Sequence, residues 1–321
     1  MRLVTLAVPA AFLLTALAGT PGGASAQDHP SREDRQLGGH SYIPSGRLPD
    51  PFVTTHARFR TAGGLATGYE AEFVVPVVDT VRITKGDIGF FGLDFEYQQN
   101  LWNRWAFRAS FEGNARTGTD LSSLLASGLS SVYGAELEGK FRLLRKERMQ
   151  VTLHALLTRK NLFGLSLLQF AEDVIEDSTV NENATLVVEG RIRRTVFGPS
   201  VAYTFKPWLG ATGFAFVGPA DPFDDAAKDQ TAFRGGVTGS VDFGKLGWAP
   251  IGILAGYDYD SFPEGANDII EGVYAITFAG AFTGREDYSI GFEITSSRIR
   301  QKDLPDEFGA ITFSINSRYY F

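Results

Sequence analysis

The 321-residue chain contains no cysteine, which excludes disulfide bonds, cysteine-ligated metal sites and thiol nucleophiles. Only four histidines are present, so the chain offers few ligands for a histidine-based metal site. Basic side chains are the minority charge, because 30 Lys and Arg stand against 37 Asp and Glu, for a net charge of −7. Such a balance argues against nucleic acid as a partner, since nucleic-acid binding needs a basic face.

The chain beyond its N-terminus also lacks any run of 18 apolar residues, so its sequence offers no transmembrane helix there. At the N-terminus, Met1-Arg2 precedes an apolar stretch, Leu3 to Leu17, and a small-residue cleavage site, Ala24-Ser25-Ala26. This pattern predicts a secretory signal peptide over residues 1–26. A membrane anchor is the alternative, but the apolar stretch is shorter than the roughly 20 residues that a spanning helix needs.

Residues 27–50 show no periodic pattern. They are polar and contain Pro30, Pro44 and Pro49 as well as Gly38-Gly39. We expect a flexible N-terminal segment here, or at most a short plug, in front of a single domain over residues 51–321.

The remainder of the chain is rich in apolar–polar alternation with a period of two residues. Trp105, Phe107 and Phe111, for example, alternate with Arg108 and Glu112. The same pattern recurs over residues 133–142, 233–243 and 288–295. An apolar, aromatic face opposite a charged face is typical of strands that stand between lipid and water. A secreted soluble β-sandwich also alternates, but its strands are usually only about 5–6 residues long.

The last strand carries the most specific pattern. Counting back from Phe321 to Ile311, every second residue except Ser317 is apolar or aromatic. The ending Arg318-Tyr319-Tyr320-Phe321 resembles the C-terminal signature of bacterial outer-membrane β-barrel proteins, although no single family within them is indicated.

That resemblance implies an outer-membrane location, with membrane lipid and lipopolysaccharide as neighbours. It also implies that Tyr319 and Phe321 form the membrane-insertion signature read by the barrel-assembly machinery. The terminal strand would then close the barrel against the first strand.

The sequence predicts an all-β protein that forms a closed antiparallel transmembrane β-barrel of about twelve strands. Single-chain bacterial barrels have an even number of strands and both termini in the periplasm. Thirteen candidates can be read, at 52–61, 65–78, 87–98, 102–116, 130–143, 149–160, 190–206, 208–217, 230–243, 247–261, 268–282, 287–299 and 309–321. The segment 52–61 or a neighbour is therefore doubtful, and fourteen strands would need one more before Pro49.

Counting back from the end gives short inner turns and long outer loops, as such barrels require. The inner turns fall at 62–64, 99–101, 144–148, 206–207 and 244–246, and the longest outer loops at 117–129, 161–189 and 218–229. The outer loops are acidic, and residues 161–185 contain five acids and no Lys or Arg.

One segment of the longest outer loop departs from the period of two. Apolar residues from Leu167 to Ile175 recur at helical spacing behind a capping box at Ser166 and Gln169. They predict a short amphipathic helix near 167–176. A lid or a constriction of the lumen is one interpretation, and a helix that only packs the loop is the other.

Alternation also points a set of charged side chains into the lumen. A twelve-stranded barrel lies between eight strands, which side chains fill, and the 16–18 strands of aqueous porins. Inward charges then either line a selective channel or pair across the lumen and nearly close it. The candidates are His56, Arg58, Arg60, Asp94, Glu96, Arg108, Glu112, Glu136, Glu138 and Arg142.

The favoured interpretation is a channel or porin-like barrel for small solutes. A non-conducting structural or surface-interaction barrel is the first alternative, and an outer-membrane hydrolase the second. His154 points inward by the same alternation, but no local motif places a nucleophile beside it. We therefore expect no enzyme, and no catalytic group, cofactor or metal site.

Overall fold

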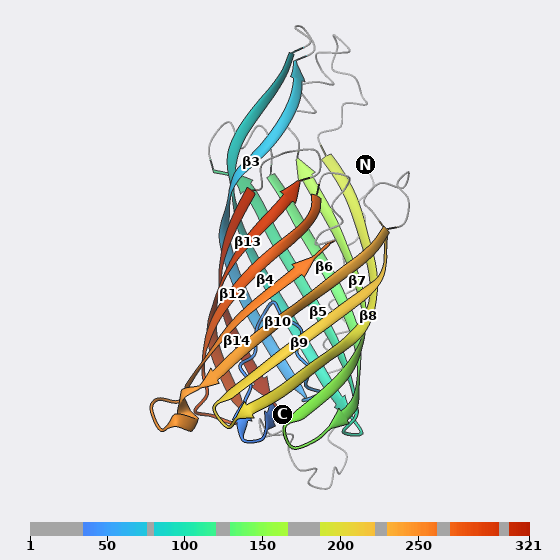
Figure 1. Ribbon diagram of the computed structural model, residues 1–321. Coiled ribbons are helices and arrows are strands. Elements are labelled where there is room, and N and C mark those ends of the chain that lie inside the picture. Colours follow the sequence, from blue (N-terminus) through green and yellow to red (C-terminus); the bar gives the residue numbers. More distant parts are fainter. Residues whose placement is uncertain are drawn as a thin grey trace, which may run out of the picture.

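Twelve antiparallel strands form a closed barrel in the computed structural model, which describes residues 35–75, 80–119, 129–165, 187–221, 230–261, 270–301 and 308–321 (Figure 1). The wall consists of β3 (His56–Val75), β4 (Thr80–Leu101), β5 (Trp105–Gly118), β6 (Leu129–Arg145), β7 (Met149–Leu165), β8 (Val187–Lys206), β9 (Leu209–Asp221), β10 (Gln230–Asp242), β11 (Ile251–Asp260), β12 (Ile270–Phe282), β13 (Tyr288–Gln301) and β14 (Phe308–Tyr320). The predicted fold class and the count of twelve strands are confirmed. Among these residues no helix has both the length and the apolar character needed to cross a membrane.

Closure joins the two ends of the wall. β14 pairs with β3 from Gly309–Thr67 to Tyr320–His56, and every other strand pairs with its neighbours in sequence. We call the end of the barrel that holds Phe321 the inner end, and the opposite end the outer end. Most inner connections are turns of two to five residues, and the longest is an eight-residue connection that begins with the 3₁₀ turn η2 (Phe243–Leu246).

The separation of 52–61 and 65–78 into two strands, with an inner turn between them at 62–64, was wrong, because residues 56–75 form one strand, β3. Gly63 and Gly64 lie within β3 and do not form a turn. Their lack of a side chain leaves space for a residue of the adjacent strand. A Cβ on Gly64 would lie 2.4 Å from the ring of Phe90, which occupies the facing position on β4. The glycine is thus covered by a cross-strand aromatic ring.

β3 and β4 continue beyond the wall as a two-stranded ribbon, which rises above the outer rim in Figure 1. Beyond a register shift between Ala66 and Tyr69, β3 pairs only with β4, up to Val75–Thr80. Gly68 lies at this shift with φ +76°, a conformation that glycine adopts without strain. The predicted helix at 167–176 lies outside the described residues.

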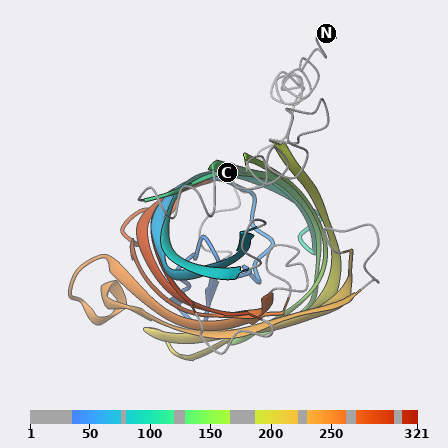
Figure 2. The ribbon, with the colours of Figure 1, turned by 90° about the horizontal axis from the view of Figure 1, so that it is seen from above.

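Residues 35–55, at the inner end of the lumen, form what we call the plug (Figure 2). It begins with a small hairpin, β1 (Gln36–Leu37) and β2 (His40–Ser41), and then runs up to Arg47 and back to the start of β3. Its apolar side chains are buried, with Leu37 2%, Ile43 4% and Phe52 0% exposed. The described part of the segment 27–50 is therefore packed inside the barrel.

Glycines of the wall accommodate the plug. A Cβ on Gly252 would lie 2.0 Å from Cδ1 of Ile43, one on Gly210 would lie 2.4 Å from the His40 ring, and one on Gly256 2.7 Å from Cδ1 of Leu48. Side chains at these inward positions would displace the plug, so the wall is shaped to receive it.

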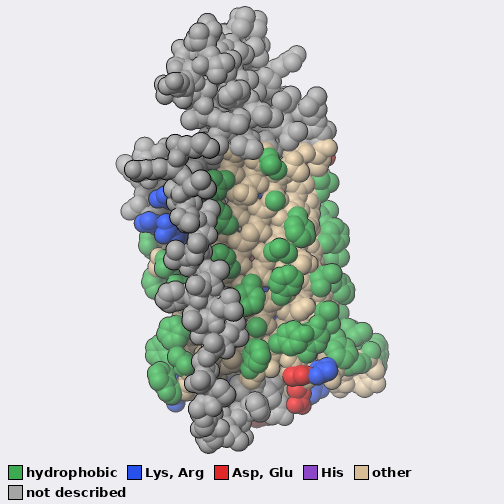
Figure 3. Space-filling view, turned by 180° about the vertical axis from the view of Figure 1, so that it is seen from behind, with side chains coloured by type: hydrophobic (Ala, Val, Ile, Leu, Met, Phe, Trp, Pro, Cys, Tyr) green, Lys and Arg blue, Asp and Glu red, His purple; other side chains and the backbone are tan. Residues whose placement is uncertain are grey.

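The outer surface of the wall is apolar over its height (Figure 3). All four tryptophans lie in or beside inner turns, and Trp102 and Trp248 are 85% and 78% exposed. Near the outer ends of their strands, Tyr133 stacks on Phe163 with ring centres 5.6 Å apart. An exposed apolar band between two aromatic rims, on a closed sheet with no free edge, is a lipid-facing surface, and the protein is a transmembrane barrel of the outer-membrane type.

We expect Phe313→Arg to destabilise the folded barrel by about 2–4 kcal/mol, because Phe313 is exposed near the middle of β14, where a charge would face hydrocarbon. Urea titration of the refolded protein in lipid vesicles measures the loss. Thr312→Arg places the same charge on the adjacent, cavity-lining position and is the control. Equal losses in both variants would contradict the assignment of Phe313 to the lipid face.

Candidate functional site

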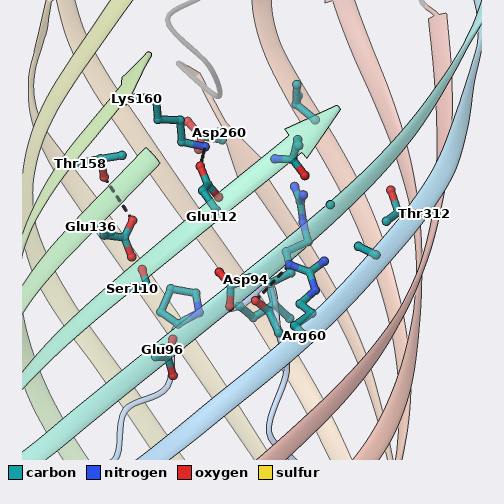
Figure 4. A pocket seen from close by; sticks show the side chains of 18 of the residues that line it. Arg60, Asp94, Glu96, Ser110, Glu112, Glu136, Thr158, Lys160, Asp260 and Thr312 are labelled. Atoms are coloured by element: carbon teal, nitrogen blue, oxygen red, sulfur yellow. Dashed lines mark hydrogen bonds and ion pairs between the residues drawn. The ribbon is translucent and has the colours of Figure 1, made fainter. Parts of the chain in front are cut away.

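The outer part of the lumen encloses a cavity of about 510 Å³ (Figure 4). Its floor is the apex of the plug, Gly46–Asp50, and its wall comes from most strands of the barrel. Ten Lys and Arg but only seven Asp and Glu line it, so the cavity is basic although the chain as a whole is acidic. Its volume lies within the range of about 300–1,000 Å³ that small-molecule sites occupy.

Eight of the ten inward residues expected from the sequence line this cavity, namely Arg58, Arg60, Asp94, Glu96, Arg108, Glu112, Glu136 and Glu138. His56 is fully buried below them, at the start of β3. Arg142 lies half-buried near the inner end of β6 and does not line the cavity.

Arg108 on β5 is the centre of the ion pairs at the base of the cavity. Its guanidinium lies 2.8 Å from Glu96 and also pairs with Glu136 and Glu138. Glu96 also forms an ion pair with Arg58 at 3.1 Å and lies 2.8 Å from the His56 ring. These groups have side-chain exposures of 0–21% and form one compact network across β3 to β6, and Lys140 and Arg318 add positive charge beside Glu138 and Glu96.

A second set of charges lies higher on the wall. Arg194 on β8 donates to both carboxylate oxygens of Asp260, at 2.8 and 3.1 Å. Lys160 lies 2.5 Å from Glu112, and both side chains point into the cavity in Figure 4. Both pairs line the open space of the cavity, and Asp260 also lies 3.9 Å from Arg234.

Asp50 joins the plug to the wall. Its carboxylate accepts from Arg318 of β14 at 2.6 Å and from Arg35 of the plug itself, and Lys140 donates to its backbone carbonyl at 2.8 Å. Burial acts to raise the pKa of Asp50, but the positive charges of Arg35 and Arg318 outweigh it and hold that pKa well below its usual range. Asp50 is therefore ionised in its buried place.

The rest of the plug is attached by fewer, well-formed contacts. Arg47 makes a bidentate pair with Asp258 of β11, with both N–O distances 3.0 Å. Ser45 donates to Glu293 of β13 at 2.6 Å, and the backbone N–H of Gly46 reaches the same oxygen at 3.0 Å.

Sequence reasoning missed several of these groups. Asp258 and Asp260 alternate with Tyr257 and Tyr259 along β11, so the period-two argument was sufficient to find them. Arg47 and Asp50 gave no such signal, because they belong to an irregular segment.

The structure also places Ser200 beside His154, a pair that no local motif revealed. The His154 ring lies 2.6 Å from the Ser200 hydroxyl and 2.6 Å from Glu138. The order Ser–His–Glu has the hydrogen-bond arrangement of a catalytic triad. Ser200 is only 1% exposed, however, and neither it nor His154 lines the cavity, while Glu138 is also held by Arg108. The chain of bonds thus serves to satisfy buried polar groups.

No family model and no curated protein sequence matches this chain. Solved structures resemble it in the barrel alone. An outer-membrane channel from Pseudomonas putida F1 is 10% identical, with 87% of this chain and 100% of that chain covered and a TM-score of 0.48. The Pseudomonas putida toluene transporter TodX is 11% identical (90% and 97% covered, TM-score 0.42), and the translocator domain of autotransporter NalP from Neisseria meningitidis is 9% identical (84% and 90% covered, TM-score 0.45).

We expect Asp50→Asn to weaken the seating of the plug by about 3–5 kcal/mol, because two buried arginines lose their shared carboxylate. Maleimide labelling of a cysteine introduced at Ser41, a plug residue 4% exposed, reports plug release, and the chain has no cysteine of its own. Asp287→Asn removes a carboxylate from the exposed pair with Arg285 and is the matched control. Unchanged labelling in Asp50→Asn would show that this ion pair does not hold the plug.

The seating of the plug is expected to weaken as the pH falls from about 6.5 towards 4. Burial lowers the pKa of His40 to about 4, and its Nε2 lies 2.8 Å from the Ser240 hydroxyl. Because the seated pKa lies below the ordinary value of 6.5, the seated plug binds fewer protons, and its stabilisation is complete only above that pH. Hydrogen exchange of the 36–42 peptide, corrected for intrinsic rates, measures the change. His40→Gln should flatten this dependence, and a dependence that survives the substitution would assign it to another group.

Proposed function

We propose that this protein is a gated outer-membrane channel for small solutes and that residues 35–55 are its gate. The observation that carries the proposal is the nature of the cavity floor. A charged cavity ends on a segment of irregular chain, and within the described residues no hydrogen-bonded ladder ties that segment to the wall. Removing such a segment from the lumen breaks side-chain contacts and leaves the barrel closed upon itself.

A non-conducting structural barrel is the second candidate, and one observation favours it. The charges around Arg108 and Arg318 are in direct contact instead of facing each other across water. If the plug never leaves, these pairs are permanent, and the cavity is a dead-end vestibule.

The remaining features of the proposal concern the route to the membrane. Residues 1–26 would be a signal peptide removed on export. Tyr319 and Phe321 would present the terminal strand to the barrel-assembly machinery, and lipopolysaccharide would surround the outer loops. Catalysis has no part in the proposal, because the Ser200–His154 pair has no access to a substrate in the cavity.

A reversible disulfide between plug and wall tests the gate. Ile43 and Gly252 are in contact, since a Cβ on Gly252 would lie 2.0 Å from Cδ1 of Ile43, and a disulfide between cysteines at these positions would need a Cβ–Cβ separation of about 3.5–4.5 Å. We expect Ile43→Cys/Gly252→Cys to pass no current in a planar bilayer when oxidised and to show conductance steps after reduction.

The wild-type chain is the control for the oxidant, because it has no cysteine. The reduced double variant and the wild type should both conduct. Absence of current in both, from protein with the heat-modifiable gel mobility of a folded barrel, would overturn the channel and leave the structural barrel.

A further inference from the structure

Two arginines at the cavity floor bind the apex of the plug through backbone carbonyls. Arg60 of β3 donates to the carbonyl of Gly46 at 3.4 Å, and Arg234 of β10 donates to that of Arg47 at 2.8 Å. β3 and β10 lie five strands apart around the barrel, so the apex is held from two sides.

Neither guanidinium has a carboxylate within hydrogen-bond distance among the described residues. The nearest acid to Arg60 is Glu293, at 3.8 Å, and one oxygen of Glu293 is already used by Ser45 and Gly46 of the plug. The nearest acid to Arg234 is Asp260, at 3.9 Å, and Asp260 is bound by Arg194. The Nε atoms of both arginines are buried and have no hydrogen-bond partner among the described residues. Each side chain therefore keeps donor capacity unused.

An oxyanion is a better acceptor for these donors than a peptide carbonyl. Hydrogen bonds between a guanidinium and a carboxylate are roughly twice as strong as those to neutral acceptors, and the planar fork of arginine fits a carboxylate in bidentate fashion. Both arginines line the cavity with 19% and 15% of their side chains exposed, so a solute inside it can reach the exposed part of each. A bound anion would then compete directly with the carbonyls of Gly46 and Arg47.

The wall above the arginines is apolar on one side. Ala62, Phe90, Val273, Ile299 and Phe308 line the cavity on β3, β4, β12, β13 and β14. This surface suits the hydrocarbon part of a solute, while the arginines suit its charge.

We propose that Arg60 and Arg234 form the binding site for a small organic acid, and that its carboxylate releases the plug apex by displacing these arginines from the carbonyls of Gly46 and Arg47. The release rests on the channel proposed above, and the binding site does not. The anion thereby becomes both the solute and the signal that opens the gate.

Benzoate and its neutral isostere benzamide are the probes, used on the full mature chain in detergent. Calorimetry should show benzoate binding at least tenfold more tightly than benzamide and than inorganic phosphate. Arg60→Gln and Arg234→Gln should each weaken benzoate binding about tenfold or more, since each removes a charged donor. Arg285→Gln removes the same charge from an exposed inner turn and should leave the affinity unchanged.

Hydrogen exchange of the peptide 44–50 measures the release. Saturating benzoate should raise its exchange in the wild type, and the two arginine variants should show raised exchange without benzoate. Equal affinities for benzoate and benzamide, or no loss in either variant, would overturn the anion site. If phosphate binds as tightly as benzoate, the site does not select organic acids. If benzoate binds but the exchange of the peptide 44–50 is not faster, the anion does not release the plug apex.

The outcomes separate this site from the channel itself. Benzoate binding by a barrel that never conducts would retain the anion site and overturn the channel and its gating. Current through the reduced Ile43→Cys/Gly252→Cys variant with no benzoate binding would retain the channel and overturn the anion site.

Discussion

Charge compensation inside a narrow lumen is the constraint on which this structure depends. Within the hydrocarbon layer the outer face of the wall must be apolar, so charged side chains at that depth can stand only on the inner face. At the inner end, water cannot hydrate each of them separately, because the plug fills the space. Arg108 therefore contacts three carboxylates, and Glu96 is shared among Arg58, Arg108 and His56. Buried pairs of this kind add little net stability, but a missing partner is costly, which makes them a means of specifying one arrangement.

The plug belongs to the same network. Asp50 supplies the carboxylate that Arg318 lacks on its own strand, and Arg47 supplies the cation for Asp258. The wall has glycines at positions 210, 252 and 256, where a side chain would overlap the plug. Barrel and plug are thus complementary in both charge and shape. Farther out, where the plug ends, a cavity remains, and ion pairs such as Arg194–Asp260 line it.

The fold could be predicted from the sequence because the two faces of each strand differ so strongly. The polarity of Phe111 and Glu112, or of Ile290 and Glu293, is enough to assign the first residue of each pair to the lipid face and the second to the lumen. The error at 62–64 came from treating Gly63-Gly64 as a turn, although a side chain on Gly64 would meet the ring of Phe90 and the backbone carbonyl of Ile311. That contact joins neighbouring strands, and no local pattern records it. The plug was harder still to predict, because the partner of Asp50 on the wall is Arg318, which is 268 residues away in the sequence.

Closure of the wall and seating of the plug are linked through Arg318. This arginine lies on β14, the last strand, and contacts both Asp50 and Glu96, at 2.6 and 3.7 Å. β14 completes the barrel by pairing with β3, which directly follows the plug in sequence. Before that pairing, Asp50 would have Arg35 but not Arg318, and the buried carboxylate would lack half of its compensation. Strand pairing between β14 and β3 therefore also places Arg318 beside Asp50, so the seated plug has its complete set of compensating charges only in the closed barrel.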